Sequence, residues 1–222
     1  MSTYDDLSDD ILLSNVIPNL GAADRLLLSQ TDRRTHALVQ GDVREGDRRF
    51  HVRDFVSSIS RLRWALEHGC RWDARICAAA AEGGYIEVLR WARGQNEGPP
   101  CPWDETLCAA AAKGGHLAVL KWAREQHPPC PWDDTVCAAA AKGGHLEMLQ
   151  WAREYGCRWN HVTCKNAARG GYLEMLKWAR EQTPPCAWNA ETCDNAAVGG
   201  HLELLQWARE QDPPCPWDAR TW

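Results

Sequence analysis

After residue 70, blocks of apolar and polar residues recur along the chain at nearly constant intervals. The clearest block reads CPWDETLCAAAAKGGHLAVLKWAREQHPP and spans Cys101 to Pro129. Similar blocks start at Cys70, Cys130, Cys157 and Cys186, and a partial one starts at Cys215. The starting cysteines are 31, 29, 27, 29 and 29 residues apart. A period of about 20–50 residues is typical of stacked supersecondary units, so the pattern predicts a repeat array.

Within the block from Cys101, the apolar spacing predicts two short helices and no strand. Asp104 is placed as the N-cap of a first helix over 105–113, where four consecutive alanines favour helix. Gly114-Gly115 ends this helix, and a second helix follows over 116–126. Two such helices cannot cover their own apolar faces, so the units must stack. The expected fold is therefore an all-α solenoid.

Every predicted second helix carries a tryptophan at the same place. We expect these large aromatic side chains to line up between successive second helices as a buried ladder. Its members are Trp91, Trp122, Trp151, Trp178 and Trp207.

Two segments with different patterns precede the array, which covers 70–222. In 1–40, Ser8 is a candidate N-cap and Pro18 ends the first of three short helices. So small a segment must dock on the array or on a partner, because it buries little surface alone. Residues 41–69 begin as a polar, arginine-rich linker. They end in a stretch that lines up with the second half of a repeat, as a degenerate capping half-repeat would.

The stretch from Ala111 to Trp122, AAKGGHLAVLKW, resembles the A-A-x-x-G-H-x-E-V-V-x-L-L stretch of the ankyrin repeat. The resemblance covers 58–222 and implies a protein-binding solenoid whose loop tips and first helices form a concave binding face. Because the unit is shorter than the usual ankyrin repeat, we expect a reduced β-turn finger. This form of the unit resembles ankyrin proteins of giant DNA viruses and some protists, in which an F-box-like segment often precedes the array.

The order of residues in 1–40 resembles an F-box. Leu7 to Leu12 (LSDDIL) stands for the opening L-P-D-E-[IL]-L, and Leu28 to Arg34 stands for the closing run. Ser8 replaces the usual proline, and no tryptophan lies near Arg34. The alternative is an N-terminal helical cap. The resemblance implies binding to a Skp1-type subunit of a cullin ubiquitin ligase, with these candidate contacts: Leu7, Ile11, Leu12, Val16, Ile17, Pro18, Leu20 and Leu26.

Composition narrows the class of partner. The net charge of −5 gives no reason to expect a nucleic acid. No apolar run approaches ~18 residues, so no membrane span is expected. The acidic start, MSTYDDLSDD, lacks the pattern of a secretory signal. Together with eleven cysteines, an odd number, this indicates a reducing compartment. We expect the cytoplasm, the host cytoplasm if the protein is viral, with the nucleus as an alternative.

The repeat pattern argues against catalysis and against a cofactor. The C-x6-C pairs do not have the two to four intervening residues typical of zinc ligands. Equivalent cysteines of adjacent repeats should lie roughly 8–10 Å apart, too far for a disulfide, so cysteine is interpreted as a small buried apolar residue. The position of His116, His145 and His201 holds tyrosine in two other repeats, which favours packing over chemistry. A metal or redox protein is kept as a third class.

Positions that differ between repeats are the candidate contacts with a target protein, since stacking does not fix them. Lys165 and Asp194 fall where ankyrin repeats carry a partly buried histidine, so they are also candidates for pairing with each other. Ordinary drift on a solvated surface is the alternative for the whole set. The candidates are Arg75, Glu105, Asp134, His161, Lys165, Asn166, Glu191, Asp194 and Asn195.

These patterns together predict a non-catalytic adaptor that links a target held by the array to a ubiquitin ligase. The alternative is an ankyrin scaffold or decoy without a ligase link. The partial unit from Cys215 has no second helix, so we also expect an open end through which the chain can self-associate. The sequence does not name the target.

Overall fold

The computed structural model describes residues 56–67, 72–94 and 100–217. The F-box-like segment and most of the linker lie outside these ranges. All regular structure in the described residues is α-helical, as predicted. The helices are α5 (Ile59–Glu67), α6 (Ala74–Glu82), α7 (Ile86–Arg93), α8 (Glu105–Gly114), α9 (Leu117–Glu125), α10 (Asp134–Gly143), α11 (Leu146–Glu154), α12 (His161–Arg169), α13 (Leu173–Glu181), α14 (Ala190–Val198) and α15 (Leu202–Glu210).

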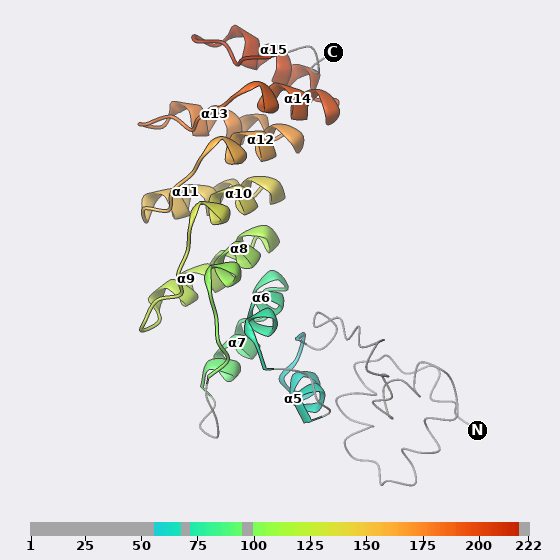
Figure 1. Cartoon of the computed structure of the whole chain (residues 1–222), viewed down its shortest axis with the longest axis vertical. Helices are drawn as coiled ribbons and strands as arrows, with labels where there is room; N and C mark the ends of the chain where they lie inside the picture. Colours follow the sequence, from blue (N-terminus) through green and yellow to red (C-terminus); the bar gives the residue numbers. More distant parts are fainter. Residues whose placement is uncertain (1–55, 68–71, 95–99, 218–222) are drawn as a thin grey trace, which may run out of the picture.

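The helices form a stack of hairpins with two columns (Figure 1). The first helices of the repeats, α6, α8, α10, α12 and α14, pack closely on one another along the array. Each second helix packs mainly against the first helix of its own repeat. This arrangement confirms the helical repeat solenoid. Before the first complete hairpin, α5 packs against α7, a second helix.

Small side chains explain why the first helices approach so closely. In α8 the buried residues are Leu107, Cys108, Ala111 and Ala112. The equivalent positions are buried in α6, α10 and α12 as well. Three of the four residues in α8 are alanine or cysteine, so neighbouring backbones can pack close together.

The predicted helix ends are confirmed in the central repeats. The Asp104 side chain accepts a hydrogen bond from the Thr106 backbone N–H and caps α8. Gly115 ends this helix in the left-handed conformation, with φ 78°, which glycine adopts without steric cost.

A second constraint on the paired glycines comes from the histidine or tyrosine that follows them. A Cβ on Gly114 would lie 2.7 Å from the His116 ring of the same repeat. A Cβ on Gly115 would lie 2.6 Å from the His145 ring of the next repeat. Each such ring therefore lies between a glycine of its own repeat and a glycine of the preceding repeat. The His145 Nε2 also lies 3.2 Å from the Lys113 carbonyl oxygen, to which it can donate, so this position has the packing role expected from the His/Tyr exchange.

The tryptophans do not form the predicted buried ladder. Each second-helix tryptophan is half-buried and packs edge-to-face against the tryptophan that precedes the first helix of its own repeat. The Trp103 and Trp122 centroids, for example, are 5.8 Å apart. The prediction was wrong because it compared only equivalent positions and left out the tryptophan of the C-x-W segment.

No helix in the described part of the chain is long and apolar enough to cross a membrane.

Candidate protein-binding surface

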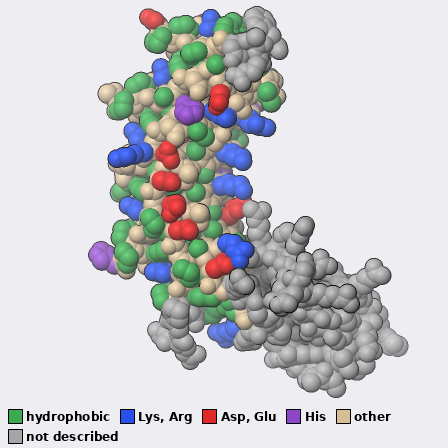
Figure 2. Space-filling model, in the orientation of Figure 1, with side chains coloured by type: hydrophobic (Ala, Val, Ile, Leu, Met, Phe, Trp, Pro, Cys, Tyr) green, Lys and Arg blue, Asp and Glu red, His purple; other side chains and the backbone are tan. Residues whose placement is uncertain are grey.

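The N-terminal ends of the first helices form a ridge along the array. Glu105, Asp134 and His161 are the first residues of α8, α10 and α12, so stacking places them one above another. Glu105 and His161 are exposed, and Asp134 is half-buried. Figure 2 shows a column of acidic side chains at the level of α8 and α10, with basic side chains on both sides.

Two other candidates lie one residue further into their helices. Arg75 in α6 is exposed, and its guanidinium lies 2.6 Å from the carboxylate of its own N-cap, Asp73. Glu191 in α14 accepts an ion pair from Lys165 of the preceding repeat at 2.9 Å. The two side chains of this pair are 44% and 35% exposed, so they lie at the surface while linking two repeats.

The remaining candidates include residues with structural roles. Asn166 donates from Nδ2 to the Ala138 carbonyl of the preceding repeat at 2.8 Å. Asn195 donates to the Glu191 carbonyl within α14, also at 2.8 Å. Both amides are half-buried, as is Asp194. The ion pair of Lys165 joins it to Glu191, a partner that the sequence analysis did not consider for it.

Asp134 links repeats too. Its carboxylate accepts a hydrogen bond from the amide of Asn160, the N-cap of α12 in the next repeat. The candidate set therefore divides in two. Glu105 and His161 project from the ridge with their charge or ring available, while Asp134, Asn166, Lys165 and Glu191 also fix the spacing of the repeats.

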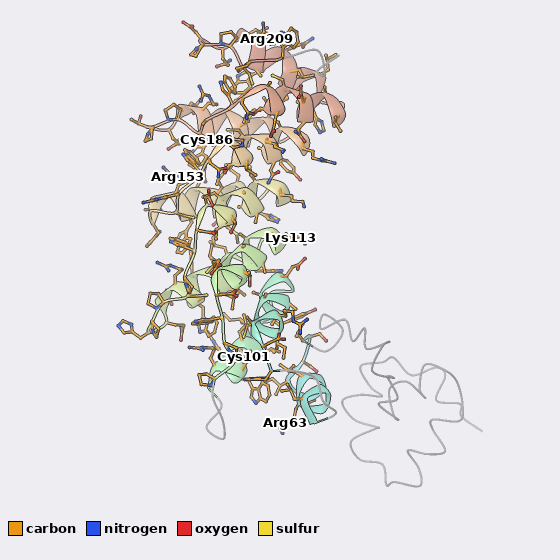
Figure 3. The ribbon with its side chains drawn as sticks, viewed as in Figure 1. Arg63, Cys101, Lys113, Arg153, Cys186 and Arg209 are labelled. Carbon is orange, nitrogen blue, oxygen red and sulfur yellow. The ribbon has the colours of Figure 1, made fainter. Side chains whose placement is uncertain are left out.

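A second set of contacts, which was not predicted from the sequence, lies on the edge where each second helix leads into the next repeat. The Arg153 guanidinium lies over the Trp159 ring, 4.1 Å from its centroid, and donates to the Cys157 carbonyl at 2.6 Å. We call the C-x-W segment that opens each repeat, before its first helix, the lead-in segment. The same arrangement occurs at four other junctions, where the arginine of a second helix contacts the lead-in segment of the next repeat. These arginines are Arg93, Arg124, Arg180 and Arg209. Figure 3 labels Arg153 and Arg209 on two levels of the array, with the repeat of Arg180 between them. The constant W-A-R run followed by C-x-W was the signal that could have revealed this contact.

One hollow of about 290 Å³ lies on this edge, between the repeats from Cys101 and Cys130. Its lining includes Trp132, Trp151 and Tyr155, and the last two rings are stacked with centroids 4.6 Å apart. Arg124 also lines it, but the Trp132 ring and the Cys130 carbonyl already engage its guanidinium. The hollow therefore resembles a packing feature of the shorter repeat more than a ligand site.

The cysteines take no part in a metal cluster within the described ranges, where no group of three or more His, Cys, Asp or Glu side chains is placed to hold an ion. The ten described cysteines are free thiols and buried, which confirms their interpretation as small core residues.

A match to one protein family agrees with a repeat array. Residues 136–180, from α10 into α13, match the family described as ankyrin repeats (many copies). No curated protein matches the chain. The similar solved structures include two crystal structures of the pentatricopeptide repeat protein PPR10 in complex with an 18-nt psaJ RNA element, each 15% identical with a TM-score of 0.37. Each match covers 90% of this chain but 35% of PPR10, so the chain spans about a third of that protein's length.

The stacked hairpins define an all-α helical repeat protein, and residues 136–180 within the stack match ankyrin repeats. Ankyrin repeats indicate a scaffold for protein–protein interaction. Residues 136–180 carry the match, and the same sequence unit recurs on both sides of them.

Proposed function

We propose that this chain is a non-catalytic adaptor whose array holds a target protein along the ridge of first-helix N-termini. The observation that carries the proposal is a contrast between repeats. The buried positions of α8, α10 and α12 are nearly the same, with leucine, valine or threonine followed by cysteine and two alanines, whereas the first residue of the helix changes from Glu105 and Asp134 to His161. Side chains that vary on a constant scaffold are free to match a partner.

The charge of the ridge favours a target with a positive surface. Glu105 and the N-caps Asp104 and Asp133 add negative charge around the first turns of α8 and α10. Complementary charge speeds diffusional encounter and discriminates against like-charged partners. Binding through this ridge should therefore weaken as salt rises.

The ridge is tested by reversing its charge. In Glu105→Lys, we expect recovery of the target to fall by about tenfold or more in proximity labelling and co-purification from the native cell. The control, Glu147→Lys, makes the same change of net charge at an exposed first-turn position of a second helix. Equal recovery by both variants, with native circular dichroism, would place target binding elsewhere.

We further propose that residues 1–40 recruit a Skp1-type subunit and so connect the target to a cullin ubiquitin ligase. The support is the order of residues that resembles an F-box, from Leu7 to Arg34. The transfer chemistry would belong to the partner enzymes. The alternative function is an ankyrin scaffold or decoy that binds the target without a ligase.

A pull-down with purified Skp1 separates these functions. Leu12→Asp/Leu20→Asp should abolish recovery, because it places charge in the apolar contact. Ser14→Asp/Gln30→Asp is the control, since it adds the same charges at polar positions. The ligase link fails if wild-type protein recovers no Skp1, or if the leucine variant recovers as much as wild type; target binding is unaffected by that failure.

Self-association through the C-terminal repeat stays a prediction. Val198 and Leu202, at the junction of α14 and α15, are 73% and 65% exposed and supply apolar surface there. Light scattering over a range of concentrations should show a rise in mass that Val198→Asp/Leu202→Asp prevents. A monomer at high concentration would contradict it.

A further inference from the structure

Cysteines of neighbouring repeats meet in the interior of the array. The first cysteine of each lead-in segment points its thiol at the start of the preceding repeat's first helix. The Cys101 Sγ lies 3.4 Å from the Asp73 carbonyl oxygen, and the Cys157 Sγ lies 3.1 Å from that of Asp133. Cys130, Cys186 and Cys215 make the same contact at 3.4, 3.4 and 3.6 Å.

This contact places each lead-in thiol next to the thiol of the cysteine in the preceding repeat's first helix. The accepting carbonyl belongs to the N-cap, and the cysteine of the first helix follows four residues later, one turn into the helix. In each case the two buried thiols are close enough to influence each other's ionisation. The pairs are Cys77/Cys101, Cys108/Cys130, Cys137/Cys157, Cys164/Cys186 and Cys193/Cys215.

Backbone groups of the lead-in cysteine also fix the position of these pairs. The Cys164 thiol lies 3.8 Å from the carbonyl oxygen of Cys186, and the Cys193 thiol lies 4.0 Å from that of Cys215. Each lead-in cysteine also donates its backbone N–H to an alanine carbonyl of the preceding second helix, at 3.0 Å for Cys101 and 2.9 Å for Cys157. Figure 3 shows Cys101 and Cys186 within the body of the stack.

Equivalent cysteines of adjacent repeats are expected to lie too far apart for a bridge. The structure pairs cysteines that are not equivalent: the second of one repeat with the first of the next. All of them are free thiols here. The separation expected for equivalent cysteines therefore does not apply to these pairs.

We propose that the five inter-repeat thiol pairs are latent disulfides, and that two-electron oxidation by a small peroxide links each repeat covalently to the next. This inference goes beyond the proposed adaptor function and does not rest on it. A bridge between repeats would restrict their separation in the unfolded and partly open states. Oxidation would thus lock the array.

Hydrogen peroxide supplies the two-electron oxidant that formation of a disulfide requires. One thiolate attacks a peroxide oxygen, the O–O bond breaks, and a sulfenic acid and hydroxide form. The neighbouring thiol then attacks the sulfenic sulfur, so that the S–S bond forms, the S–O bond breaks and the oxygen leaves as water. In total, two thiols and one peroxide give one disulfide and two waters.

The two thiols of the central pair are coupled. Burial opposes ionisation of both and raises the pKa of Cys137, whereas the Arg153 charge favours the thiolate at both. Since the thiolate is the nucleophile, either cysteine can be oxidised first, and the other then resolves it.

The test oxidises the whole chain under native conditions. The protein is treated with hydrogen peroxide at neutral pH, remaining thiols are alkylated, and unreduced peptides are mapped by mass spectrometry. We expect bridges between Cys108 and Cys130 and between Cys137 and Cys157, with the other described pairs following the same rule. The thermal unfolding midpoint should rise and return to its original value on reduction. Mostly intramolecular bridges within a repeat, intermolecular bridges, or free thiols in a native fold would overturn the proposal.

Two variants make the test specific. In Cys137→Ala, the sulfenic acid formed at Cys157 has no resolving partner, so it should be trapped by a cyclic diketone while the other bridges still form. In Cys157→Ala, the sulfenic acid formed at Cys137 likewise has no resolving partner and should be trapped in the same way. Native circular dichroism of both variants confirms that they fold. No trapping in either variant, or equal trapping at these residues in the wild-type protein, would contradict the resolving role of the neighbouring thiol.

Discussion

The Tyr172 ring lies between two glycines of different repeats. A Cβ on Gly170 would lie 2.3 Å from it within its own repeat, and one on Gly144 would lie 2.6 Å from it in the preceding repeat. Gly144, the second glycine of its own pair, therefore meets two requirements: it adopts a positive φ, and it leaves space for the ring of the next repeat. Gly200 has only the first, because a Cβ there meets nothing within 4 Å.

That contrast separates conformational strain from ring packing. Gly144→Ala and Gly200→Ala change residues with φ 78° and 73°, so each should lose about 1–2 kcal/mol from the left-handed conformation. Gly144→Ala should lose about 1–3 kcal/mol more, because its methyl group collides with Tyr172. Urea unfolding followed by circular dichroism measures both. Equal losses would show that the ring does not constrain the glycine.

The arginine at each repeat junction is another single-residue constraint. Arg153→Lys keeps the charge but loses the planar group that lies over Trp159 and donates to the Cys157 carbonyl. We expect a loss of about 1–2 kcal/mol in the free energy of unfolding. The control Arg158→Lys, at an exposed lead-in position, should change it by less than about 0.5 kcal/mol. Similar values for the two variants would argue against the Arg–Trp contact as a source of stability.

At the scale of the helix, the first helices depend on their N-caps. Asp104→Ala removes the acceptor of the Thr106 N–H at the start of α8 and should cost about 1 kcal/mol. Its neighbour Glu105 adds only a charge in the first turn, so Glu105→Ala should cost about 0.3–1 kcal/mol and lose that effect in high salt. Chemical denaturation at two salt concentrations distinguishes them. A cap variant as stable as wild type would contradict this role.

The helices and their ends were predictable because their causes are local. The alanine run of α8, the Asp104 cap and the Gly115 stop all act within one repeat, and the structure places each as expected. The alignment of the first-helix N-termini along the array was also predictable, since any regular stack of repeats places equivalent helix ends one above another. The exposed residues among the site candidates, such as Glu105 and His161, lie on that ridge.

The contacts that were not predicted from the sequence join positions that are not equivalent in adjacent repeats, so they depend on how one repeat is displaced relative to the next. Comparing equivalent positions could not show that Cys101 meets Cys77, or that Lys165 reaches Glu191. The tryptophan pairs were missed for a related reason, since each joins a lead-in segment to a second helix. These contacts need the path of the lead-in segment across the stack, which is set by hydrogen bonds such as Cys101 N–H to the Ala92 carbonyl.

For the whole molecule, stability should be carried by contacts between neighbouring repeats. First helices contact the first helices before and after them, and the thiol pairs, Arg–Trp contacts and His or Tyr rings also join adjacent units. In such an array, stability is approximately the sum of repeat and nearest-neighbour terms. The same defect should therefore have different consequences in an inner repeat and in the last complete one.

Trp122→Ala and Trp207→Ala test that expectation with matched residues. Both tryptophans are half-buried and pack edge-to-face on a tryptophan of their own repeat, at 5.8 and 5.9 Å. Because each is half-buried, we expect each repeat to lose about 2–3 kcal/mol, below the full cost of a buried tryptophan. Trp122→Ala should uncouple the flanking repeats and broaden or split the main unfolding transition. Trp207→Ala should add a small early transition over α14 and α15 and leave the main one nearly unchanged. Hydrogen exchange read by mass spectrometry assigns each transition to its helices. A uniform shift of one sharp transition in both variants would mean that the array unfolds as a single unit.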